Sequence, residues 1–178
     1  MELEMALQTR KSVRSYQKKA VDRALIEQMI GAAIQAPSWK NSQVARYHVV
    51  TSEELLEKIR NDALPDINRP KCVDAPVLII TTFVKNRSGF ERNGKPTNEV
   101  AQGWGFYDCG LHNENLLLKA KELGLDTLVM GIRDAGKIRE ILQIPQDEVI
   151  VSVIVVGYGA VDPVKPKRKT VEDITKFY

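Results

Sequence analysis

The chain has 178 residues, of which 43% are hydrophobic and 28% are charged, and it contains 11 glycines and 8 prolines. This length allows one domain with a core that needs no disulfide or metal, and the composition excludes collagen-like, low-complexity and broadly disordered proteins. The net charge is only +3, and no apolar run approaches the ~20 residues that a membrane-spanning helix needs. The acidic start of the chain does not resemble a signal peptide, so we expect a cytoplasmic protein.

Three helices and two strands are predicted in the first half of the chain. A short helix over residues 2–8 precedes a basic segment that begins at Arg10. Asp22 is a suitable N-cap for a helix with apolar residues at helical spacing, which Ala36-Pro37-Ser38 ends. A strand is expected near residues 47–50, and Ser52 is expected to cap the next helix. Residues 76–84 are almost all apolar or β-branched, which is typical of a buried strand.

The second half begins with a polar loop over residues 85–98, the longest irregular stretch and a candidate recognition loop. A long helix is predicted over residues 104–122, closed by Gly124. A strand over 126–131, a short helix capped by Asp134 and a strand over 149–157 follow. The last segment is expected to be extended and basic. Alternating helices and buried strands predict an α/β or α+β sandwich, with residues 1–178 as one domain.

The positive charge gathers in two places. Residues 10–19 contain five basic residues and no acid, and residues 163–178 contain five basic residues against two acids. Two such clusters are typical of solvated surface, of a nucleic-acid patch, or of two groups of cations that bind one compact anion from opposite sides. Both clusters are short and contain Ser, Thr or Pro. This favours a discrete phosphate site, because guanidinium groups and hydroxyls converge on phosphate oxygens.

The sequence lacks the motifs of several common enzyme classes. The chain has no Gly-rich phosphate loop of the G-x-x-x-x-G-K-[ST] or G-x-G-x-x-G type, and no G-x-S-x-G nucleophile elbow. Cys72 and Cys109 have no metal-ligand spacing with His48 and His112, so we expect neither a metal site nor a structural disulfide. His48 is expected to be structural, in its strand.

Four motifs in chain order carry a resemblance to a known family. They are Arg10-Lys11-Ser12-Val13-Arg14, the loop Ala36-Pro37-Ser38-Trp39-Lys40-Asn41-Ser42-Gln43, Asp74-Ala75-Pro76-Val77 at a strand entry, and Gly157-Tyr158-Gly159 before the basic tail. Together they resemble the nitroreductase family of FMN-dependent oxidoreductases. The resemblance implies a homodimeric α+β sandwich with a mostly antiparallel sheet flanked by helices. Val44-Ala45 stand where the family usually has Pro-Trp, which predicts a roomier pocket wall.

The resemblance also implies which residues bind FMN. In the first motif, Arg10 and Ser12 suit the phosphate and ribityl oxygens, and Arg14 suits the N1/O2 edge of the ring. Lys11 belongs to the same cofactor-binding motif. The resemblance implies that a second group of cations also binds the phosphate, namely Lys167, Arg168 and Lys169. The loop would present Pro37, Ser38, Asn41 and Gln43 to the flavin of the partner subunit. Met130 and Gly131 match the position of a backbone contact near N5, although Met130 alone would be a core residue.

The implied reaction is a ping-pong transfer of hydride from NAD(P)H to a nitroaromatic or quinone-type acceptor, with no catalytic side chain. Trp104, Phe106 and Tyr107 are candidates for the surface where nicotinamide and acceptor alternate, and core packing is their other possible role. The expected partners are a second copy and a small-molecule acceptor, without nucleic acid or membrane. Two alternatives stay open: other flavin chemistry on this fold (reductive dehalogenation or flavin breakdown), and a cofactor-free basic module that binds anions or nucleic acid.

Overall fold

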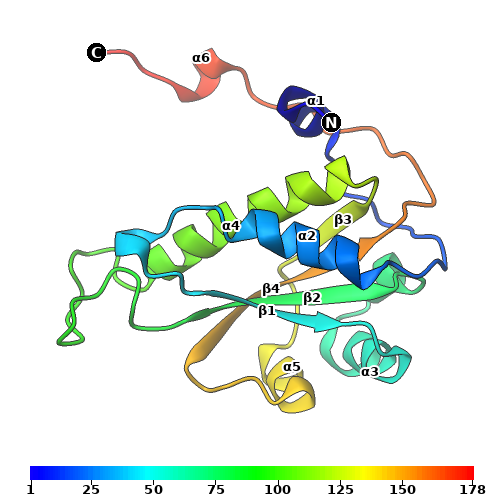
Figure 1. The fold of residues 1–178 in the computed structure, drawn as a ribbon, viewed down its shortest axis with the longest axis horizontal. Coiled ribbons are helices and arrows are strands. Elements are labelled where there is room, and N and C mark those ends of the chain that lie inside the picture. Colours follow the sequence, from blue (N-terminus) through cyan, green and yellow to red (C-terminus); the bar gives the residue numbers. More distant parts are fainter.

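The computed structural model describes residues 1–178 as a four-stranded sheet between two layers of helices (Figure 1). The strands are β1 (Ala45–Val50), β2 (Val77–Val84), β3 (Asp126–Met130) and β4 (Glu148–Gly157). They lie in the order β1-β2-β4-β3, and every neighbouring pair is antiparallel. This arrangement confirms the expected α+β sandwich with an antiparallel sheet.

The helices divide between the two faces of the sheet. Helices α2 (Arg23–Ala33) and α4 (Gly103–Glu122) cover one face, and α3 (Glu53–Ala63) and α5 (Ala135–Leu142) cover the other (Figure 1). Helix α1 (Leu3–Thr9) lies outside α4, and two 3₁₀ turns, η1 (Trp39–Asn41) and η2 (Arg69–Cys72), lie in connecting segments. No helix is both long enough and apolar enough to cross a membrane.

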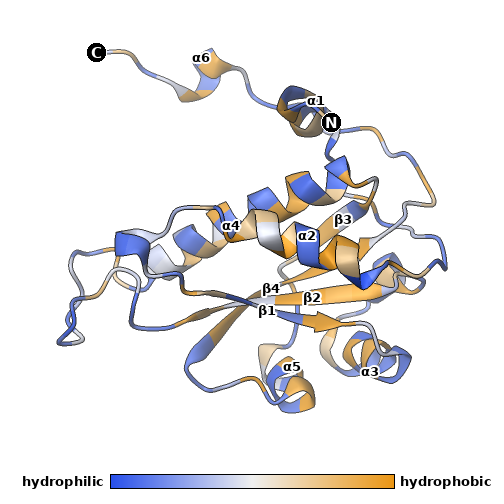
Figure 2. Ribbon diagram, in the orientation of Figure 1, coloured by the Kyte–Doolittle hydropathy of each residue, from blue (hydrophilic) through white to orange (hydrophobic).

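The core has two sides because the central strands are apolar on both faces. In β2, Val77 and Ile79 pack against α2 and α4, whereas Leu78 and Ile80 pack toward α3 and α5. Strand β4 alternates in the same way, and both strands are mainly hydrophobic in Figure 2. Successive side chains of a strand point to opposite faces, so a strand covered on both sides appears as a continuous apolar run.

The predicted helices and strands are all present, with ends that differ by a few residues. Asp22 and Asp134 cap α2 and α5, since their side chains accept from the N–H groups of Ala24 and Lys137. Ser52 occupies the N-cap position of α3, but its side chain makes no capping hydrogen bond.

The expectation of an extended last segment was wrong in part. Residues Val171–Ile174 form a short helix, α6. Its capping box explains the difference: the Thr170 side chain accepts from the Asp173 N–H, and the Asp173 carboxylate accepts from the Thr170 N–H.

The N-terminal segment and the exit from β4 run side by side at the β3 edge of the sheet. Val13 N–H donates to the carbonyl of Thr127 in β3 at 3.0 Å, and Gln17 N–H donates to the carbonyl of Tyr158 at 2.8 Å. Gly159 permits this close approach, because a Cβ there would lie 2.6 Å from Asp126 Oδ2. The two basic segments of the sequence therefore leave the sheet from the same edge.

Candidate functional site

The two basic clusters of the sequence meet beside the C-terminal end of α1. Lys165 Nζ donates to the carbonyl oxygens of Leu7 at 2.6 Å and Gln8 at 3.0 Å. Loss of solvation, followed by the positive charges of Arg10 and Arg168, lowers the pKa of Lys165. Cations of both segments are thus within electrostatic reach of one another. We call this surface, residues 10–14 with 165–169, the basic edge.

The acids near the basic edge are exposed and are weak partners. Arg10 Nε lies 3.6 Å from Glu114 Oε1 of α4, and Lys11 Nζ lies 2.5 Å from Asp162 Oδ1. The side chain of Glu114 is 50% exposed and that of Asp162 is 92% exposed. Exposed ion pairs of this kind are weak because water screens them. A bound anion can therefore replace these acids as the partner of the cations.

The remaining predicted residues of the basic edge face solvent or the sheet edge. Ser12 forms an isolated bridge with Thr127, which fixes its backbone beside β3. Arg14 is exposed, with Nη1 3.4 Å from the carbonyl of Ser12. Lys167 and Lys169 are exposed and form no ion pair in the structure.

The backbone that follows β3 is held in place at the same edge of the sheet. Met130 is buried, with its side chain in the core, whereas Gly131 is exposed. Asn68 Nδ2 donates to the carbonyl of Ile132 at 2.8 Å, and Asp134 N–H donates to the carbonyl of Ala63 at 2.8 Å. Of the two predicted residues, Gly131 offers its exposed backbone to a ligand, whereas the Met130 side chain is not available.

The loop between α2 and β1 is a tight turn with strained backbone. Lys40, Asn41 and Gln43 have φ values of 45°, 52° and 48°, in the left-handed region that non-glycine residues seldom adopt. The turn is held partly by Gln43 N–H, which donates to Ser38 Oγ at 2.9 Å. Pro37, Asn41 and Gln43 are exposed. Strain of this kind persists where the surroundings fix the backbone, and it is frequent at ligand sites.

Asp108 of α4 fixes this loop and the next one. It is 2% exposed, and its carboxyl oxygens accept from Trp39 N–H (3.1 Å to each), Ser42 Oγ (3.3 Å) and Ser88 Oγ (2.6 Å). Sequence reasoning missed Asp108 and Ser88. The one available signal was an acid beside Cys109, on the side of the predicted helix that carries core residues. We call residues 37–43 and 85–98 the loop pair.

The three aromatic residues at the start of α4 have different surroundings. The Trp104 ring lies 4.5 Å from that of Trp39, and Trp104 Nε1 donates to Asn98 Oδ1 at 2.9 Å. Trp104 is therefore a packing residue of the loop pair. Phe106 and Tyr107 are 47% and 59% exposed, so they offer most of the aromatic surface that a ligand could contact.

Of Val44 and Ala45, which were predicted to make a pocket wall roomier, Val44 does not line the surface, and the prediction stands only for the partly exposed Ala45. Val44 is 1% exposed and packs in a core cluster with Phe83 and Cys109. Helix α4 approaches this cluster closely because residue 105 is glycine, where a Cβ would lie 2.3 Å from the Phe83 ring. Val44 therefore fills core space and cannot widen a surface pocket.

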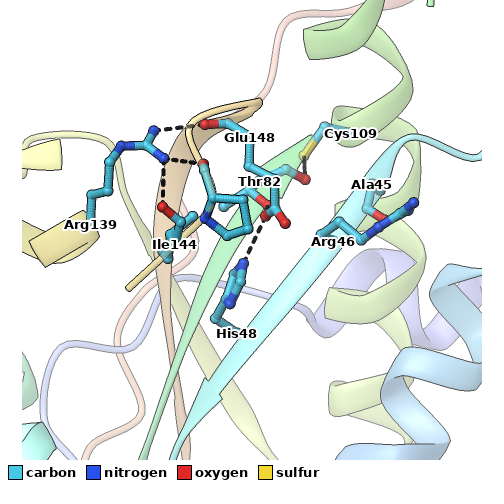
Figure 3. Close-up of polar contacts among 9 residues, drawn as sticks. Ala45, Arg46, His48, Thr82, Cys109, Arg139, Ile144 and Glu148 are labelled. Carbon is cyan, nitrogen blue, oxygen red and sulfur yellow. Dashed lines mark hydrogen bonds and ion pairs between the residues drawn. The ribbon is translucent and has the colours of Figure 1, made fainter. Parts of the chain in front are cut away.

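A polar cluster on the opposite face of the sheet joins β1, β2 and β4 (Figure 3). His48 Nε2 lies 2.7 Å from Glu148 Oε2, and the Thr82 hydroxyl donates to the same oxygen. Burial raises the pKa of Glu148, but hydrogen bonds from Thr82 and His48 outweigh it, so the pKa is lowered overall. Arg139 Nη2 donates to the Glu148 carbonyl at 2.7 Å. These contacts agree with the expected structural role of His48.

The structure brings the N-terminal and C-terminal motifs together but leaves the loop apart from them. Figure 1 places η1 at the N-terminal end of α4 and α1 beside its C-terminal end. The contacts with α4 agree with this placement. The loop binds Asp108, whereas Arg10 pairs with Glu114 and the terminal amine of Met1 pairs with Glu122. Asp108 and Glu114 are six residues apart, which is about 9 Å along the axis of α4 and about 120° around it. The loop pair and the basic edge are thus separate surfaces of one chain.

Comparisons with known proteins agree with the four sequence motifs. The nitroreductase family pattern matches residues 7–158. A Methanothermobacter thermautotrophicus protein provisionally named NADH dehydrogenase/NAD(P)H nitroreductase is 33% identical over 170 residues, covering 92% of this chain and 80% of that protein. The Caenorhabditis elegans homologue of iodotyrosine dehalogenase 1 is 28% identical over 206 residues, covering 97% of this chain and 60% of that protein.

A solved structure gives the same result for the fold. The nitroreductase family protein from Streptococcus pneumoniae TIGR4 superposes with a TM-score of 0.85 at 21% identity, covering 99% of this chain and all of that one. The family match spans most of the chain, and the Methanothermobacter relative covers 92% of it. The chain belongs to the nitroreductase family.

Proposed function

We propose that this chain is a single-domain FMN enzyme that works as a homodimer. It would transfer hydride from NAD(P)H to nitroaromatic or quinone-type acceptors in a ping-pong cycle. Its family makes it an oxidoreductase, and related proteins carry names that refer to NAD(P)H. One of the neighbouring structures is named as an NAD(P)H:FMN oxidoreductase.

The observation that carries the proposal is the meeting of Arg10, Lys165 and Arg168 from two distant segments. Residues 10–14 and 165–169 contain seven cations, whose only ion-pair partners are the two exposed acids Glu114 and Asp162, so this surface has more positive charge than these acids neutralise. A dianionic phosphate with three acceptor oxygens fits such a set, because guanidinium groups bind phosphate through paired hydrogen bonds. The donors present therefore fit FMN.

Each part of the basic edge would have its own role toward the cofactor. Arg10, Lys11, Ser12 and the cations Lys167, Arg168 and Lys169 would hold the phosphate and ribityl chain, and Arg14 would face the electron-rich edge of the ring. The exposed backbone at Gly131 would lie near the reactive part of the ring. Bound FMN would supply the hydride chemistry, and the protein would orient it and exclude water.

Two copies of the chain are needed if the loop motif also serves the flavin. Asn41 and Gln43 are exposed on a rigid turn that contacts α4 at Asp108, whereas Arg10 of the same chain contacts α4 at Glu114, on a different side of the helix. A second copy could bring its loop to the first copy's basic edge, and twofold symmetry would then create two equal sites. Phe106 and Tyr107, near that loop, would contact the acceptor, with Trp104 supporting them.

The direct test is to purify the chain and analyse what it binds. We expect a flavin absorbance spectrum, release of FMN and not FAD on denaturation, and a dimer by analytical ultracentrifugation. Under anaerobic conditions NAD(P)H should bleach the flavin before any acceptor is added, and a quinone should restore the colour. A chain that binds no flavin when FMN is supplied, or that is reduced only with acceptor present, would contradict the proposal.

Reductive dehalogenation is the second candidate, favoured by one observation. Two of the related proteins are an iodotyrosine dehalogenase homologue and mouse iodotyrosine deiodinase 1, at 28% and 29% identity over nearly the whole chain. The chain spans only 60% and 66% of these relatives. Iodide release from iodotyrosine under reducing conditions, at a rate above that of quinone reduction, would favour this function.

A further inference from the structure

A cavity of about 270 Å³ lies beside the N-terminus of α3, outside the basic edge and the loop pair. Its wall includes Lys18, Lys19, Glu53, Arg60 and Asp74. The volume falls just below the ~300–1,000 Å³ of pockets for drug-sized ligands, so the cavity suits a small molecule. None of these five residues belongs to the predicted FMN set.

Arg60 is a buried charge in this wall whose one ion-pair partner is an exposed acid. It is 6% exposed, its Nη2 donates to the carbonyl of Ala75 at 2.7 Å, and its Nε has no hydrogen-bond partner. The nearest acid, Glu53, is 3.7 Å away and 71% exposed. Burial raises the pKa of the neighbouring Cys72 even though Arg60 opposes this, so the thiol provides no negative charge. A buried cation of this kind is costly unless an anion pairs with it.

The N-terminal end of α3 borders the same cavity at Glu53 and has free N–H groups there. Ser52 gives no side-chain cap, and the first hydrogen bond of the helix runs from Leu56 N–H to the Ser52 carbonyl. The N–H groups of Glu53, Glu54 and Leu55 therefore have no protein acceptor. Thr51 and Glu53 both line the cavity. Free N–H groups and the helix dipole together favour an anion at this position.

We propose that this cavity binds the phosphate group of a small ligand, with Arg60 and the α3 N-terminus as its ligands. Lys18 and Lys19 add positive charge, so the wall has three cations against the two acids Glu53 and Asp74. Glu53 acts as the internal competitor, because its carboxylate is the closest one to Arg60 and is free to turn into solvent. The site is separate from the flavin phosphate site and does not depend on it.

Inorganic phosphate is the probe, titrated at constant ionic strength into the full chain saturated with FMN. Backbone amide NMR should show saturable shifts at Glu53, Glu54 and Leu55. Lys18→Ala should weaken binding several-fold and Arg60→Gln should abolish it. Glu53→Gln should tighten binding several-fold, because the competing carboxylate is gone. Lys58→Ala removes the same charge from an exposed position of α3 outside the cavity, and it should bind like the parent.

Several outcomes would overturn the site. Shifts confined to the amides of residues 10–12 would place phosphate at the basic edge, and acetate binding without phosphate binding would exclude a phosphate site. Equal phosphate affinity in the parent, Lys18→Ala and Glu53→Gln would show that the charges of Lys18 and Glu53 do not act on a bound phosphate. If Arg60→Gln fails to fold, these two variants decide, since both change exposed side chains.

Discussion

At the basic edge, cations from two segments stand on the surface beside exposed acids, whereas in the loop pair one buried carboxyl group, that of Asp108, holds the backbone of two loops. The basic edge therefore leaves charge available to a ligand. The loop pair uses its buried charge internally and presents exposed side chains, such as Gln43, on a fixed turn. Substitutions should separate these roles: loss of an exposed side chain that contacts the ligand should reduce affinity, and loss of the buried Asp108 carboxyl group should reduce stability.

Asp108→Ala should have the largest effect on stability. It leaves the Trp39 N–H and the Ser42 and Ser88 hydroxyls without their acceptor in a buried place. Each unsatisfied buried donor costs about 1–3 kcal/mol, so we expect the free energy of unfolding to fall by about 3–5 kcal/mol. Urea denaturation measures this. Asp66→Ala, at a 95% exposed side chain, is the control and should change stability by less than about 0.5 kcal/mol. Equal losses in both variants would show that the Asp108 carboxyl group does not stabilise the loop pair.

Arg10→Ala should act on affinity and leave stability nearly unchanged. Its only ion-pair partner, Glu114, is half exposed, so we expect less than about 1 kcal/mol of lost stability. The lost charge-assisted contact to phosphate should raise the Kd for FMN about 10- to 100-fold. Quenching of flavin fluorescence measures this Kd. Lys176→Ala, an exposed cation beyond the basic edge, should leave the Kd as in the parent. A parent-like Kd in Arg10→Ala would exclude the basic edge as the phosphate site.

A mixed dimer tests whether the two surfaces meet across copies. Chains with Arg10→Ala and chains with Gln43→Ala are each expected to bind FMN weakly. When the two are unfolded together and refolded, about one site in four should combine an intact basic edge with an intact loop, by random pairing of copies. Titration of high-affinity FMN sites counts this fraction. If both surfaces of a site come from one chain, every site keeps one defect and no high-affinity sites return.

The sequence predicted the elements because their signals are local. The apolar run of β2 and the caps Asp22 and Asp134 depend on residues close together in the chain. It also predicted two basic segments around one anion. The contact of Lys165 with the end of α1 shows that the two segments lie together, and the anion between them stays a prediction. Lys165 itself was not selected, since its position depends on the pairing of Ser15–Gln17 with 158–160, a long-range contact. Asp108 and Arg60 were missed because their importance lies in burial and in distant partners, which spacing along the chain does not reveal.

His112, on α4 between Asp108 and Glu114, should give the smallest effect, visible only through pH. It is 4% exposed and neither ring nitrogen has a hydrogen-bond partner. Burial lowers its pKa below the ordinary 6.5, and Asp108 opposes this only in part. The unfolded chain therefore takes up a proton that the folded chain resists, so the free energy of unfolding should fall as pH drops below 6.5. In His112→Leu, which is similar in volume and has no ring nitrogens, stability above pH 6.5 should stay within about 1.5 kcal/mol of the parent. The variant should lose less stability than the parent as the pH falls further. Urea denaturation on both sides of pH 6.5 measures the difference, and parallel losses in the two proteins would mean that acid sensitivity arises elsewhere in the chain.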